Sequence, residues 1–137
     1  MIYHKASGYF AASYLMEKSE LHCLMDERDY DNLIVPPIEE EQFVALYDYD
    51  TNKPIVFATY AFPEQEHIEK YYKDLYFPRE GFYGNGSAPM VVDFICVTGK
   101  RDIITGFRYI KQMFNNLGYS YMHWLRIEQG RSGYHKW

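Results

Sequence analysis

The stretch MVVDFICVTG, residues 90–99, is apolar almost throughout and ends in a glycine. Its β-branched and aromatic residues predict a strand over residues 90–97. A strand without a polar side needs cover on both faces, so we expect it at the centre of a sheet. Side chains alternate along a strand. The alternation predicts one face with Val91, Asp93 and Ile95, and the other with Val92, Phe94 and Cys96.

The rest of the chain supplies strands and helices around this central strand. Strands are predicted over residues 42–48, 55–61 and 120–128, the first two forming a hairpin. Helical spacing of apolar residues predicts helices over residues 7–17, 19–28, 63–75 and 102–117, the last capped by Asp102. The proline pair within residues 33–38 predicts an extended crossing. The order of elements indicates a single domain over residues 1–137, of α/β (α+β) class, with one mixed sheet and helices on both faces.

Asp93 is the polar residue in the middle of the apolar strand, and an ionised carboxylate is costly to bury alone. His22 is a candidate partner, since a carboxylate on one ring nitrogen leaves the other nitrogen to act as a base. Ser19 lies three residues earlier, and as a helix N-cap its hydroxyl would accept from the backbone N–H of His22. The pattern leaves three interpretations of His22 open: a core histidine in a structural contact, a metal or redox neighbour of Cys23, or a catalytic base.

Composition limits the kinds of protein that the chain can be. No apolar run approaches the roughly 20 residues of a membrane span, and the start MIYHKASGYF lacks the features of a signal peptide. Cys23 and Cys96 lack metal-ligand spacing, so we expect two buried free thiols in a reducing, cytoplasmic setting. The histidines show no ligand spacing either, so no metal is expected.

Charge is divided unevenly along the chain, whose formal net charge is −5. Residues 1–98 carry 7 Lys and Arg against 17 Asp and Glu, whereas residues 99–137 carry 7 against 2. The sequence TGKRD joins the Asp93 strand to a helix start and indicates an anion site at Lys100 and Arg101, although a solvated basic helix start explains it equally well.

Four ordered motifs belong to a set that runs from Gly8 to about Ile127, nearly the whole chain. They are GYFAASYLMEKSELH (residues 8–22), IVPPIEEEQFVAL (34–46), KPIVFATYA (53–61) and VVDFICVTG (91–99). In this order and spacing they resemble the RTX toxin-activating lysine acyltransferases, the hemolysin-activating family. The resemblance implies a fold similar to that of the GNAT acetyltransferases, and transfer of a fatty acyl group from acyl carrier protein to lysines of a protoxin.

The resemblance also implies roles for individual residues. The family's catalytic histidine and aspartate fall on His22 and Asp93, and its serine falls on Ser19 in a supporting role. The donor would be acyl-phosphopantetheine on acyl carrier protein, with no bound cofactor. Because carrier proteins are acidic, we expect the donor to bind the basic positions of the carboxyl-terminal region, namely Lys100, Arg101, Arg108, Lys111 and Arg126.

We therefore expect a protein-lysine acyltransferase in which His22 is the base and Asp93 orients its ring. The expected partners are acyl carrier protein, an acceptor protein and a second copy of the chain in a homodimer. The alternative is a non-catalytic binding protein of the same fold, which would use its basic, aromatic carboxyl-terminal region to bind a partner or nucleic acid.

Overall fold

The computed structural model describes residues 5–20, 22–84, 86–126 and 131–137. Within these ranges one five-stranded sheet has the order β1-β2-β3-β4-β5, so the apolar strand β3 is central. The strands are β1 (Phe43–Tyr47), β2 (Pro54–Ala61), β3 (Met90–Ile95), β4 (Tyr121–Arg126) and β5 (Arg131–Lys136). Neighbouring strands are antiparallel except β3 and β4, which are parallel. The expected mixed sheet is confirmed.

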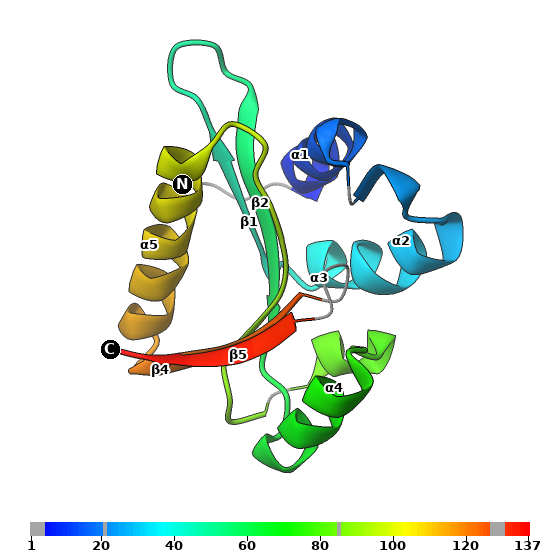
Figure 1. Ribbon diagram of the computed structural model, residues 1–137, viewed down its shortest axis with the longest axis vertical. Helices are drawn as coiled ribbons and strands as arrows, with labels where there is room; N and C mark the ends of the chain where they lie inside the picture. Colours follow the sequence, from blue (N-terminus) through cyan, green and yellow to red (C-terminus); the bar gives the residue numbers. More distant parts are fainter. Residues whose placement is uncertain (1–4, 21, 85, 127–130) are drawn as a thin grey trace.

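Helices cover both faces of the sheet, as expected (Figure 1). The helices are α1 (Lys5–Lys18), α2 (Glu27–Leu33), α3 (Val35–Glu39), α4 (Ile68–Asp74) and α5 (Lys100–Asn116), with 3₁₀ turns at His22–Leu24, Gln65–His67 and Arg79–Tyr83. Helix α5 connects the parallel strands and packs Ile110 and Phe114 against one face of the sheet. Helix α1 packs Leu15 against the other face. No helix in the described part of the chain is both long and apolar enough to cross a membrane.

A β-bulge in β3 changes which side chains share a face. Thr59 of β2 pairs with Asp93, but Tyr60 pairs with Val91, so Val92 is an extra residue. Val91 consequently packs on the α5 face, whereas Asp93 points to the α1 face, where it meets His22. The prediction that Val91 and Asp93 share a face was therefore wrong, because the extra residue of a bulge interrupts the alternation of side chains between the two faces.

The segment between α1 and β1 also differs from expectation. The predicted helix over 19–28 is a short 3₁₀ turn, and α2 begins only at Glu27 because the Asp26 carboxylate accepts from the backbone N–H of Asp29 at 2.8 Å. The predicted extended crossing over 33–38 is wrong, since Pro36 and Pro37 occupy the first turn of α3, where a missing N–H costs nothing. Gly99, not Asp102, is the residue that caps α5.

Strand β5 was not predicted, because RSGYHK has a glycine at its centre and few strand-forming residues. A side chain on Gly133 would collide with Trp124 of β4, since an added Cβ would lie 2.3 Å from the indole ring. The glycine thus lets the two strands pair with the ring lying against the β5 backbone. Residues 127–128 of the predicted strand 120–128 lie outside the described residues.

A buried histidine ties α4 to the end of the sheet. The Tyr72 hydroxyl donates to the carbonyl of Gly133 at 2.5 Å and also contacts Nδ1 of His123. A carbonyl can only accept, so the single hydroxyl proton goes to Gly133 and His123 Nδ1–H donates to the Tyr72 oxygen. Burial lowers the pKa of His123 below its ordinary value of 6.5 and raises the pKa of Tyr72 to about 12.

The depressed pKa of His123 predicts a loss of stability in acid. Below pH 6.5 the unfolded chain binds a proton that the folded chain resists, so the free energy of unfolding falls as pH drops through this window. The slope due to one histidine is at most about 1.4 kcal/mol per pH unit. Urea unfolding at a series of pH values should show a weaker acid dependence for His123→Phe than for the unmodified protein. Equal slopes would contradict this role of His123.

Candidate active site

His22 and Asp93 form a buried hydrogen-bonded pair across 71 positions of sequence. His22 Nε2 lies 2.8 Å from Asp93 Oδ1, and the two residues are 4% and 6% exposed. His22 sits in the 3₁₀ turn after α1, which is closed by backbone hydrogen bonds from Cys23 N–H to Ser19 O and from Met25 N–H to His22 O. Asp93 is held by the central strand. The predicted contact between the two residues is therefore confirmed.

Ser19 extends the pair into a row of three groups. Its hydroxyl accepts from the backbone N–H of His22 at 3.3 Å, as predicted, and its Oγ also lies 2.8 Å from His22 Nδ1. An ionised Asp93 can only accept, so the neutral ring carries its proton on Nε2 and Nδ1 accepts from the Ser19 hydroxyl. The backbone N–H of Phe94 donates to the same Asp93 oxygen at 2.9 Å. The hydrogen bonds fix both the tautomer and the orientation of the ring.

The row reaches the surface at its serine end. Ser19 is half-buried, whereas His22 and Asp93 are buried. The neighbouring Cys23 and Leu24 are exposed, Leu24 by 83%. A reactant can therefore reach the unprotonated nitrogen of His22 from the Ser19 side more easily than it can reach the Asp93 carboxylate.

Strands β3 and β4 stop pairing just before Asp93. The paired residues are Met90 with His123 and Val91 with Trp124, although β3 continues to Ile95 and β4 to Arg126. Among the residues that the structure describes, Asp93 thus lies on a part of β3 that does not pair with its parallel neighbour. The two strands can admit a ligand at this position without breaking a sheet hydrogen bond.

Comparison with known families gives one match. The model of the RTX toxin acyltransferase family matches residues 7–131. The chain belongs to this family. The matched region includes Ser19, His22 and Asp93, so the row of three groups lies inside the family's own domain. No curated protein sequence matches the chain.

In this RTX toxin acyltransferase the predicted donor-binding residues lie apart from the histidine. Lys100, Arg101 and Arg108 are exposed on α5, which covers the opposite face of the sheet from α1, the helix that leads into the His22 turn (Figure 1). Lys111 is half-buried, and its ammonium lies 5.4 Å from the centre of the Trp137 ring. The side chain of Arg126, at the end of β4, lies outside the described residues.

Neither cysteine belongs to the hydrogen-bonded row. The prediction that Cys23 is buried was wrong, since Cys23 is exposed. It lies on the outer side of the 3₁₀ turn, where its thiol donates to the Glu20 carbonyl at 3.5 Å. Cys96 is partly buried and packs on the α5 face, away from Asp93. Across the described ranges, no group of three His, Cys, Asp or Glu side chains is arranged to hold a metal ion.

Thr59 is a polar neighbour of the site that sequence reasoning missed. It is fully buried, pairs directly with Asp93 across β2 and β3, and its hydroxyl has no hydrogen-bond partner within the described residues. The strand context IVFATYA gave no signal, because threonine is common in strands for its shape alone. Only the register of the two strands places this hydroxyl beside the carboxylate.

We expect Thr59→Val to raise the free energy of unfolding by about 1 kcal/mol. The substitution keeps the shape and removes a buried hydroxyl whose desolvation is not compensated. Urea unfolding measures the effect. Thr98→Val is a control, because the Thr98 hydroxyl donates to Asp102 at 2.5 Å and its removal loses a real hydrogen bond. A loss of stability in Thr59→Val would show that this hydroxyl is satisfied in solution.

Proposed function

We propose that the chain transfers a fatty acyl group from the phosphopantetheine thioester of acyl carrier protein to the ε-amine of a lysine in a toxin protein. The supporting observation is the Ser19–His22–Asp93 row, with its unprotonated nitrogen directed to the accessible end. Membership of the RTX toxin acyltransferase family supports acyl transfer as the reaction class. The family supports the reaction class only. Lysine as the acceptor and acyl carrier protein as the donor belong to the proposal.

His22 acts as the general base in this reaction. The lysine amine attacks the thioester carbonyl and the C–S bond breaks, and the departing thiolate of the carrier takes up the proton that His22 has removed from the amine. The amine proton passes to His22 Nδ1, directly or through the Ser19 hydroxyl that already bonds this nitrogen. Asp93 accepts from Nε2–H and stabilises the imidazolium that forms, which is the role of the aspartate in a Ser-His-Asp triad. On the edge of β3 beyond Val91, backbone N–H groups would donate to the oxygen of the thioester carbonyl and stabilise the negative charge that develops there.

The donor carrier docks on the exposed basic side of α5. Arg101 and Arg108 are seven residues apart and therefore lie on one side of the helix, with Lys111 three residues further. Lys100 and Arg101 stand at the helix start, where the backbone N–H groups favour the phosphate of the phosphopantetheine arm. The helix follows β3, so this docking places the arm close to the point where β3 and β4 part.

Removal of the base or its partner should abolish most of the transfer. We expect His22→Gln and Asp93→Asn each to lower kcat by roughly 10²–10⁴-fold, because general-base catalysis contributes about this much. The measurement is transfer of a radiolabelled acyl group from loaded carrier protein to a toxin substrate. Circular dichroism must show a folded chain, since breaking a buried pair is destabilising in itself. Near-normal turnover in either variant would contradict the catalytic assignment.

Matched variants separate the base mechanism from its alternatives. Cys23→Ser and Cys96→Ser should retain transfer, and a folded but inactive cysteine variant would favour a thiol nucleophile. Ser19→Ala should retain part of the activity, because water can replace the hydroxyl as a relay. An acyl ester on Ser19, detected in the intact mass of the chain, would instead assign Ser19 as a nucleophile. A folded chain that transfers nothing would favour the alternative of a binding protein.

Charge reversal on α5 should weaken carrier binding. Arg101→Glu and Arg108→Glu should each raise KM for the loaded carrier by roughly fivefold, the effect of about 1 kcal/mol, with a smaller change in kcat. Lys53→Glu is a control for net charge, since Lys53 is exposed in the β1–β2 turn. KM measured at two salt concentrations should lose part of its salt dependence in the α5 variants. Equal KM values in all three variants would exclude α5 as the docking surface.

A further inference from the structure

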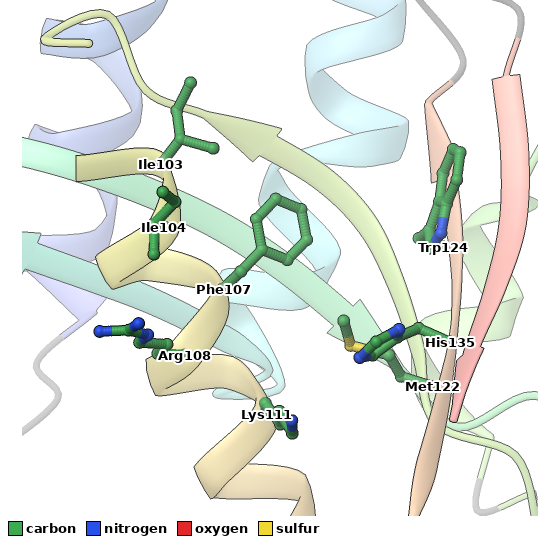
Figure 2. Close-up of a pocket in the computed structure, with 8 residues that line it drawn as sticks. All are labelled: Ile103, Ile104, Phe107, Arg108, Lys111, Met122, Trp124 and His135. Atoms are coloured by element: carbon green, nitrogen blue, oxygen red, sulfur yellow. The ribbon is translucent and has the colours of Figure 1, made fainter. Parts of the chain in front are cut away.

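A groove of about 400 Å³ runs between α5 and strands β4 and β5 (Figure 2). Its walls are apolar side chains from the helix and from β4, namely Ile103, Ile104, Phe107, Met122 and Trp124. Figure 2 shows the helix residues and Trp124 on opposite sides of the groove. The volume falls within the range of about 300–1,000 Å³ that is typical of ligand pockets.

The edge of the groove is basic. Arg108, Lys111 and His135 complete the lining, and none of the lining residues that the structure describes is acidic. The long stems of arginine and lysine pack along apolar surface while their charged groups stay in water. The same Arg108 and Lys111 belong to the side of α5 to which we assign the carrier. The groove therefore lies directly beside the proposed docking surface.

One wall of the groove leads to Asp93. The Phe107 ring stacks on Phe94, with ring centres 4.5 Å apart. Phe94 follows Asp93 in β3 and donates its backbone N–H to the Asp93 carboxylate. Trp124, on the opposite wall, is the last residue of β4 that pairs with β3. The groove thus begins at the place where the two strands part beside the active site.

We propose that this groove holds the fatty acyl chain of the donor thioester. The thioester carbonyl lies where β3 and β4 part, and the terminal methyl group points toward Met122 and His135. This inference rests on the proposed function and names the subsite for the chain. An alkyl chain matches walls that offer few hydrogen-bonding groups, because each methylene that leaves water favours binding. A carrier bound on α5 then delivers its chain into the adjacent groove.

A binding experiment tests the subsite without any transfer activity. The sequence has two tryptophans, so Trp137→Phe leaves Trp124 as the reporter. Dibromostearate quenches an indole that it touches, and we expect saturable quenching of Trp124. Ile104→Glu should weaken the binding by about tenfold or more, because a carboxylate in the apolar wall opposes the chain. Gln112→Glu adds the same charge to exposed α5 surface outside the groove and should leave binding unchanged.

Absence of saturable quenching, or equal binding by the two glutamate variants, would overturn the proposal. This result does not depend on acyl transfer. A chain that binds dibromostearate at Trp124 but transfers nothing would therefore refute the proposed function and keep the groove as an alkyl-chain site.

Chain-length selectivity gives a second test. His135 lines the groove and pairs with Met122 of β4, which precedes Trp124 and so lies away from the point where β3 and β4 part. His135→Trp should therefore exclude about two methylenes at the far end of the chain. The ratio of kcat/KM for palmitoyl carrier to that for butyryl carrier should fall about tenfold. Tyr134→Trp is the matched control, since successive residues of a strand point to opposite faces and Tyr134 is not part of the lining. An unchanged ratio in His135→Trp would overturn the proposed path of the chain.

Discussion

The carboxylate of Asp93 stands in the centre of the sheet, and burying it there requires a hydrogen-bond partner. His22 meets this requirement from a turn that precedes the sheet by many residues. The bond therefore fixes the amino-terminal helical segment against β3. The same bond sets the tautomer of the ring and directs Nδ1 to Ser19. One interaction thus connects the packing of the fold with the chemistry of the site.

The bulge at Val92 makes this arrangement possible. Without the extra residue, Asp93 would share a face with Val91, which packs on the α5 side. With it, the carboxylate turns to the α1 face, while Phe94 stays on the α5 face and stacks on Phe107. Strand β3 therefore directs the Asp93 carboxylate to the α1 layer and the Phe94 ring to the α5 layer. This division suits a reaction in which the acceptor approaches from one face and the donor from the opposite face.

Much of the fold could be predicted from sequence because its signals are local. The hydrophobic runs of β1, β2 and β3 and the helical spacing in α5 are visible without any long-range contact. The failures lie where local signals are weak or ambiguous. Strand β5 depends on a cross-strand fit between Gly133 and Trp124, and α3 begins with prolines that also suit an extended segment.

Three features are visible in the amino-acid sequence without any structure: the central strand, the need of Asp93 for a partner, and the division of charge between the two ends of the chain. These follow from composition and from the free energy of burying particular groups. Tertiary structure alone decided the bond from Ser19 to the His22 ring, the place of Thr59 beside Asp93 and the groove under α5. Each of these depends on strand register, on a one-residue bulge, or on how a helix lies across a sheet. Such features arise from the packing of distant segments, and no short stretch of sequence encodes them.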